Sequence, residues 1–197
     1  MIALLRGTLV EKHPTQVIVE THGVGYEVTI PVSTFSALPD SGEAVTLRVH
    51  THVREDALAL FGFATLDEKR LFEKLIQVSG IGPKLAVTVL SGLPTADLIR
   101  AIREGHVEQL VRIPGVGKKT AERMVLELRD KMTFAGVEQA VAAPSGPVSV
   151  VEEDVLSALV NLGCNRPAAE AAVKKAKAAG TADEFEALFR RSMEFIR

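Results

Sequence analysis

The chain has 197 residues, 47% of them hydrophobic, and a formal net charge of −2 at pH 7. This composition excludes an intrinsically disordered protein and is sufficient for two or three small domains. No apolar run approaches ~20 residues, so no membrane span is predicted. The single cysteine excludes an internal disulfide framework. Without a secretory signal, the sequence predicts a cytoplasmic protein.

The small negative net charge conceals a basic middle third. Residues 65–132 carry 12 basic and 9 acidic side chains, whereas both flanking thirds are net acidic. A nucleic-acid partner is therefore expected to contact the middle of the chain. The five histidines are scattered, and His50 and His52, which share a strand face, have no acidic or cysteine partner nearby in the sequence, so no metal site is predicted.

Residues 1–64 are predicted to form a small closed β-barrel. Apolar and polar residues alternate at Val17 and Val19 and again over 45–53, which indicates strands with one buried face. The strand density fits a five-stranded barrel of the OB type, with a short helix at 33–38. One tyrosine and no tryptophan leave little surface for stacking bases, so the barrel is interpreted as a scaffold.

The segment Arg54-Glu55-Asp56 lies between the last two predicted strands, at a hairpin tip. Acidic residues in turns are usually solvated. Beside nucleic acid, however, the same carboxylates would repel phosphate. The residues alone therefore leave two interpretations open, a solvated turn and a wedge that holds strands apart.

A nine-residue pattern occurs twice in the basic third. It reads apolar, any residue, Gly, apolar, Gly, any, Lys, any, Ala, over 78–86 and again over 113–121. Glycine permits positive φ and a close approach of the backbone to a ligand. A helix follows each copy, so unpaired N–H groups and a lysine would face an anion. The candidate residues are Gly80, Gly82, Lys84, Gly115, Gly117, Lys118, Lys119 and Arg123.

Two nucleotide-binding patterns are excluded. A Walker loop needs a glycine five residues before the Gly-Lys pair, where this chain has Arg112. A dinucleotide-binding fold needs a strand before the glycines, yet the residues ahead of both copies have helical spacing. A helix, a glycine turn and a second helix form the helix-hairpin-helix pattern, which binds backbone phosphates through main-chain amides without reading bases.

Local signals place the helices of residues 65–132. Thr65 and Glu68 form a capping box, with the Glu68 side chain reaching back, and this starts the first helix. Pro83 suits the first turn of the helix after the first glycine pattern. Thr95 is the expected N-cap of the next helix, and a final helix is expected over 118–132.

Residues 133–150 are rich in Ala, Gly, Pro, Ser and Val and are predicted to be a flexible linker. Helical spacing returns in residues 151–197, with helices expected over 151–162, 168–179 and 182–196. Three short helices on a linker resemble a ubiquitin-associated-type bundle, for which docking of a partner protein is the expected use. The whole is predicted to be a multidomain α+β protein.

This order of domains resembles the RuvA family, which binds Holliday junctions in bacterial branch migration. The resemblance covers the whole chain. Besides the two glycine patterns, it rests on Met1-Ile2, Arg6-Gly7, Gly23-Val24-Gly25-Tyr26, Val53-Arg54-Glu55-Asp56, Leu60-Phe61-Gly62-Phe63 and Thr120-Ala121-Glu122-Arg123. It implies a non-catalytic homotetramer, without cofactor, that holds a four-way junction open on a basic face. Glu55 and Asp56 would then be an acidic pin at the centre.

The resemblance also implies partners and a cellular setting. The tail domain would dock the hexameric ATPase RuvB, two tetramers could enclose one junction, and a RuvC resolvase would join the same complex. The setting implied is the bacterial cytoplasm at the nucleoid. DNA recombination, DNA repair and the SOS response to DNA damage are the processes implied.

Two other functions remain open from the residues. A helix-hairpin-helix glycosylase or lyase needs an aspartate shortly beyond the hairpin and often a lysine nucleophile. Asp130 is the one candidate downstream of the second copy, and Glu127 with Lys131 indicate an ordinary solvated helix face. The third possibility is a non-catalytic single-strand or RNA chaperone built on the barrel, which competition between a four-way junction and single strand would test.

Overall fold

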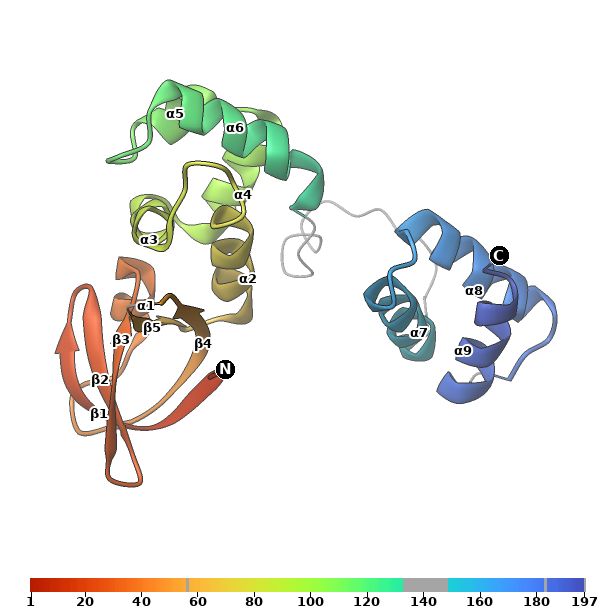
Figure 1. Ribbon diagram of the computed structural model, residues 1–197, viewed down its shortest axis with the longest axis horizontal. Helices are drawn as coiled ribbons and strands as arrows, with labels where there is room; N and C mark the ends of the chain where they lie inside the picture. Colours follow the sequence, from red (N-terminus) through yellow and green to blue (C-terminus); the bar gives the residue numbers. More distant parts are fainter. Residues whose placement is uncertain (56, 133–148, 183, 197) are drawn as a thin grey trace. The chain divides into compact units, whose positions relative to one another are not determined.

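The computed structural model describes residues 1–55, 57–132, 149–182 and 184–196 (Figure 1). The chain divides into two compact units, Met1–Val141 and Ala142–Arg197. The predicted linker lies outside the described residues except for Ser149 and Val150, which begin the first helix of the second unit.

The first unit begins with a closed five-stranded barrel. Its strands are β1 (Leu4–His13), β2 (Gln16–Thr21), β3 (Val24–Thr29), β4 (Ala44–Val53) and β5 (Leu58–Phe63). They are hydrogen-bonded in the order β1-β2-β3-β5-β4, and β4 closes on β1. The pairing of β3 with β5 is parallel and the others are antiparallel. The short helix α1 (Val32–Ala37) connects β3 to β4. The predicted OB-type barrel is therefore confirmed.

Strand alternation fills the barrel interior, as the sequence predicted. On β4, Leu47 is fully buried and Val49 is 1% exposed. The prediction is wrong at the end of the same strand, where Val53 is 68% exposed. The reason is geometric. β1 pairs with β4 from Ala44 to Arg48, so the end of β4 lies beyond the closure of the barrel and has no interior to fill.

Helices follow the barrel in the first unit. They are α2 (Leu66–Leu75), α3 (Pro83–Gly92), α4 (Thr95–Glu104), α5 (Val107–Val111), α6 (Lys118–Leu128) and the 3-10 turn η1 (Arg129–Lys131). No single helix in the described part of the chain is long and apolar enough to span a membrane. The bent pair α3 and α4 meets those criteria only when joined across its 101° break.

Of the two threonines predicted to be N-caps, the structure confirms one and corrects the other. The Thr65 hydroxyl accepts the Glu68 N–H at 3.1 Å, so Thr65 is the N-cap of α2, as predicted. Thr95 is not an N-cap, and that prediction was wrong. The carbonyl of Pro94 accepts the first helical bond, from the Leu98 N–H at 2.9 Å, which makes Pro94 the N-cap and Thr95 the first helical residue.

The Glu68 side chain reaches further than a capping box requires. Instead of returning to the N-cap residue, its carboxylate accepts the Thr34 hydroxyl at 2.9 Å and the Ala64 N–H at 3.2 Å. Thr34 lies on α1 and is fully buried, and Glu68 is 5% exposed. A buried carboxylate is tolerated when it is hydrogen-bonded in this way. These bonds fasten α2 to the barrel.

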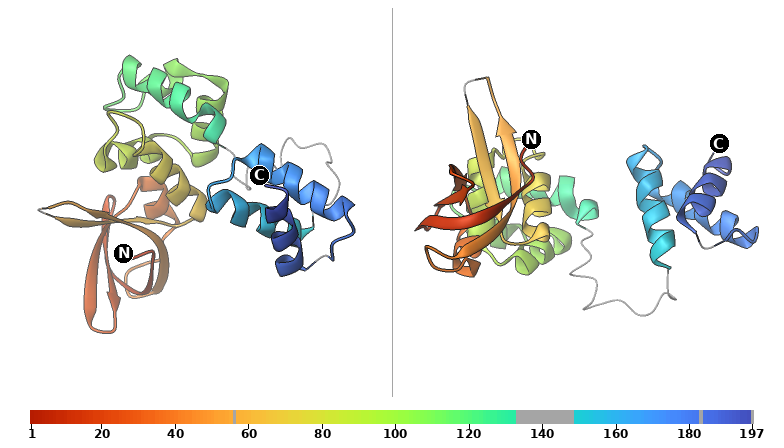
Figure 2. Two further views of the ribbon diagram at one scale, coloured as in Figure 1. Left: turned by 45° about the vertical axis from the view of Figure 1, so that its right-hand side comes forward. Right: turned by 90° about the horizontal axis from the view of Figure 1, so that it is seen from below.

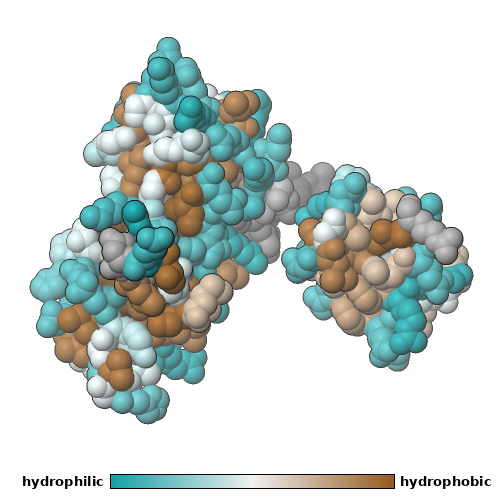
Figure 3. Space-filling model, in the orientation of Figure 1, coloured by the Kyte–Doolittle hydropathy of each residue, from teal (hydrophilic) through white to brown (hydrophobic). Residues whose placement is uncertain are grey.

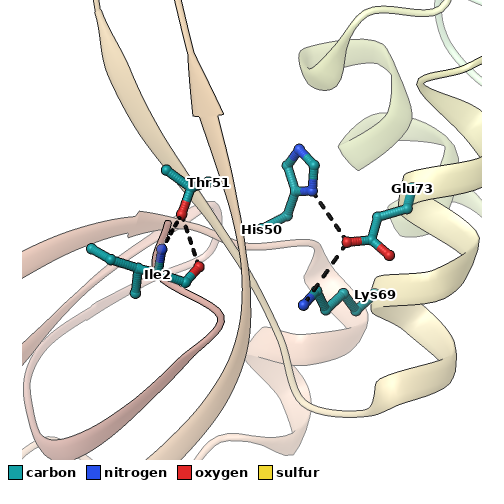
Figure 4. Close-up of polar contacts among 5 residues, drawn as sticks. All are labelled: Ile2, His50, Thr51, Lys69 and Glu73. Carbon is teal, nitrogen blue, oxygen red and sulfur yellow. Dashed lines mark hydrogen bonds and ion pairs between the residues drawn. The ribbon is translucent and has the colours of Figure 1, made fainter.

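Aromatic packing and a polar contact complete this attachment. The Phe72 ring of α2 stacks on Phe61 of β5, with ring centroids 5.1 Å apart. His50 Nδ1 of β4 lies 3.3 Å from the Glu73 carboxylate of α2, and Lys69 Nζ lies 3.9 Å from the same oxygen (Figure 4). The barrel and the helices that follow it thus share one compact unit.

The second unit is a three-helix bundle, as predicted. Its helices are α7 (Val150–Asn161), α8 (Arg166–Ala178) and α9 (Phe185–Glu194). The starts of α8 and α9 differ from those predicted by two residues or more. α8 begins two residues early because the Asn165 side chain caps it, accepting the Ala168 N–H at 2.8 Å, and α9 begins later than residue 182. The buried core consists of Val155, Leu159, Ala169, Val173, Ala176 and Leu188.

Candidate nucleic-acid interface

The two glycine patterns adopt the same backbone conformation. In the first hairpin, residues 78–84, Gly80 has φ 91° and Gly82 has φ −86° and ψ 172°. In the second hairpin, residues 113–119, Gly115 has φ 82° and Gly117 has φ −82° and ψ 167°. Positive φ is strained for residues with a Cβ, so the first glycine of each pattern is needed to turn the chain. The second glycine is the N-cap of the following helix.

Each turn is anchored by the apolar residue between its glycines. Ile81 and Val116 are both 4% exposed. The Ile81 N–H donates to the Val78 carbonyl, and the Val116 N–H donates to the Ile113 carbonyl, each at 3.0 Å. The two turns are therefore held rigidly by the core, while the glycines beside them stay at the surface.

The helix starts that follow are open to an anion. Neither α3 nor α6 has a side-chain hydrogen bond at its N-cap or an acidic residue in its first turn. In contrast, α2 has its Thr65 cap together with Asp67 and Glu68. The first-turn N–H groups of a helix have no intrahelical acceptor, and the positive end of the helix dipole attracts anions. The two hairpins therefore present bare amides.

Lysines accompany these amides at a cost to the helix. Lys84, Lys118 and Lys119 are exposed in the first turns of α3 and α6. A cation at a helix N-terminus opposes the helix dipole by ~0.3–1 kcal/mol. The same positive charge would stabilise a bound phosphate. Lysines at these helix starts are therefore better explained by anion binding than by helix stability.

The hairpins pack side by side in the first unit. A Cβ at Gly80, Gly82 or Gly117 would meet no atom within 4 Å, so the backbone there is open. At Gly115 it would lie 3.1 Å from the Leu85 side chain, which belongs to α3 behind the first hairpin. The second turn therefore rests against the helix that follows the first turn.

Arg123 connects the two hairpins. It lies on α6, and its Nη1 donates to the Ser79 hydroxyl at 3.2 Å and to the Ser79 carbonyl at 3.4 Å. The sequence predicted Arg123 as a candidate binding residue, but not that it reaches the first hairpin. Ser79 was missed altogether, because the two residues are 44 positions apart and no local pattern relates them.

The predicted acidic tip lies at the end of the β4–β5 ribbon. The Arg54 N–H donates to the Ala57 carbonyl at 2.8 Å, which closes a tight turn after β4. Glu55 is exposed in this turn. Asp56, the other predicted pin residue, lies outside the described residues.

The other predictions concern a metal site and a catalytic aspartate in the described part of the chain. No group of three or more His, Cys, Asp or Glu side chains there is arranged to hold a metal ion. Asp130, the candidate for a glycosylase or lyase, is exposed in the 3-10 turn η1.

The barrel joined to paired glycine hairpins defines a class of protein that grips the phosphate backbone of nucleic acid. Two family models match the chain, the RuvA N terminal domain over residues 1–62 and the SAM-like helix-hairpin-helix tandem over residues 72–130. The chain is 68% identical over 197 residues to the Holliday junction branch migration complex subunit RuvA of Solibacter usitatus, covering all of both chains.

Two further relatives carry the same name. The protein of Acidobacterium capsulatum is 55% identical over 204 residues, covering all of both chains. The protein of Syntrophotalea carbinolica is 57% identical over 167 residues, covering 83% of each. The chain therefore belongs to the RuvA family.

Proposed function

We propose that the chain binds four-way DNA junctions by their shape, independently of base sequence, and supports branch migration as a non-catalytic subunit. The observation that carries this proposal is the duplicated glycine hairpin, with two uncapped helix starts free of acidic residues. The relatives' names supply the kind of DNA and the process.

The first-turn N–H groups of α3 and α6 bind phosphate oxygens from the minor-groove side of a duplex arm, except at Pro83, which has no N–H. Lys84, Lys118 and Lys119 add positive charge beside them, and Arg123 contributes from α6. Contacts of this kind fix the position of the duplex and carry no base information. Base sequence therefore has little influence on affinity.

Preference for a junction arises from assembly. Four copies in a homotetramer engage four arms at once, and this avidity is absent on an isolated duplex. Glu55 and Asp56 lie at the centre of that assembly and repel phosphates, which guides strands outward as they unpair. Two tetramers can enclose one junction.

Each domain of the chain has its own role in the proposed function. Residues 1–64 form the barrel with the acidic pin, 65–132 bind DNA, 133–150 are a flexible linker, and 151–197 dock the RuvB ATPase. RuvC resolvase joins the same complex at the junction, in the bacterial cytoplasm at the nucleoid. This arrangement is the assembly that the family resemblance implies.

A gel shift of four-way junction, duplex and single strand over a range of salt tests the proposal, with native mass determination of the free protein. The junction should be bound most tightly. Its affinity should fall with salt by roughly 0.9 log units per log unit of salt for each phosphate neutralised. Affinity that stays flat between low and moderate salt would contradict phosphate binding, and preference for single strand would favour a chaperone.

A further inference from the structure

The last residue pair of the β4–β5 ribbon is apolar and uncovered. Val53 of β4 pairs with Leu58 of β5, and their exposed fractions are 68% and 64%. They continue the strand positions that fill the barrel, where Val49 and Leu60 are 1% and 6% exposed. Of the large hydrophobic residues on the barrel strands, Val53 and Leu58 are the most exposed. We refer to them as the apolar pair.

The apolar pair lies at the end of the β4–β5 ribbon. The turn directly beyond it is closed by the hydrogen bond from the Arg54 N–H to the Ala57 carbonyl. Figure 2 shows β4 and β5 extending past the rest of the barrel toward this turn. Figure 3 shows hydrophobic surface on the face of the barrel from which the ribbon projects. The apolar pair therefore lies directly beside the turn that carries Glu55.

We propose that Val53 and Leu58 contact nucleobases that are unpaired at the crossover of the junction. This inference rests on the proposed function and adds a second ligand group, the face of a base, beside the turn where Glu55 repels phosphate. Apolar side chains placed beside base steps unstack them without reading their sequence. The apolar pair thus promotes opening of base pairs at the crossover.

Charge and area favour bases as the occupant. The exposed Glu55 carboxylate keeps phosphates away from the tip, so the bases are the part of a strand that can approach the apolar pair. Two aliphatic side chains form a patch of at most a few hundred Å². A stable protein interface buries about 800 Å² on each partner, so this patch is too small to hold a second copy by itself.

The test compares the full chain with its Val53→Thr, Leu58→Gln variant on a junction that carries 2-aminopurine at the crossover. Both substitutions keep the approximate side-chain volume at exposed positions. The unmodified chain should raise 2-aminopurine fluorescence on binding, and the variant should lose about half or more of that rise. Its junction affinity in a gel shift should change by less than about threefold, because the phosphate contacts are intact.

A matched control is Val10→Thr with Val24→Thr, which likewise replaces two exposed apolar residues with polar ones, on strands outside the ribbon. This control should keep the full fluorescence rise. An undiminished rise in the ribbon variant overturns the inference. A change in its native mass also overturns it, because the apolar pair would then contact another copy of the chain. Failure of the unmodified chain to prefer the junction would instead count against the proposed function.

Discussion

The two hairpins share a backbone but differ in the donors they offer. Both turn at a positive-φ glycine and both end in a glycine N-cap. The first helical residue after the first hairpin is Pro83, which has no N–H to donate. At the equivalent position after the second hairpin, Lys118 supplies both an N–H and a charged side chain, and Lys119 follows it. The second hairpin therefore offers an anion more donors and more positive charge than the first.

Arg123 reduces the difference in donors between the two hairpins. It belongs to the helix of the second hairpin, yet its guanidinium contacts Ser79 of the first. A duplicated sequence pattern has thus produced two hairpins with unequal donors, and Arg123 forms a contact between them. A sequence repeat predicts that two segments share a backbone conformation. The side chains around each segment determine how much each would contribute to binding.

The largest expected difference between the hairpins is in DNA affinity. Lys118→Ala with Lys119→Ala should weaken junction binding by roughly tenfold for each phosphate that is no longer neutralised, at about 0.1 M salt. Lys84→Ala should weaken it by one such factor. The salt slope, measured by gel shift, should fall further in the double variant than in Lys84→Ala. Equal reductions would show that the hairpins contribute equally.

The hairpins should also differ in their tolerance of a Cβ. Gly80→Ala and Gly115→Ala each force alanine into positive φ, at about 1–2 kcal/mol. Gly115→Ala should cost more, because the new Cβ would lie 3.1 Å from Leu85, whereas the space at Gly80 is open. Urea unfolding of both variants measures the difference. A larger destabilisation in Gly80→Ala would mean that the Leu85 side chain moves away from the new Cβ at position 115 without loss of stability.

The smallest expected effect tests which hairpin Arg123 serves. In a double-mutant cycle on junction affinity, Arg123→Ala should couple to Ser79→Ala by about 0.5 kcal/mol or more, as residues in contact do. Arg123→Ala and Lys118→Ala should be closer to additive. Strong coupling of Arg123 to Lys118 alone would show that Arg123 acts with the second hairpin. Arg123→Lys is a useful companion variant because it keeps the charge.

The sequence predicted local conformation well. The hairpin glycines, the Thr65 cap and the barrel alternation all follow from rules that act over a few residues. The contact of Arg123 with Ser79 was not predictable in this way, nor was the bond of Glu68 to Thr34, because distant segments meet only in the fold. The exposure of Val53 was not predicted. Alternation of apolar and polar residues shows which side of a strand a residue occupies, but not where along the strand the barrel closes.

The attachment of α2 to the barrel fixes the distance between the parts of the protein that are proposed to contact DNA. Glu68 with Thr34, and Phe72 with Phe61, join the barrel to the hairpin helices in one compact unit. The separation between the ribbon turn and the glycine turns is thereby set by the protein and not by the DNA. On the proposed function, protection from hydroxyl-radical cleavage should begin the same number of nucleotides from the crossover on every arm, whatever its sequence.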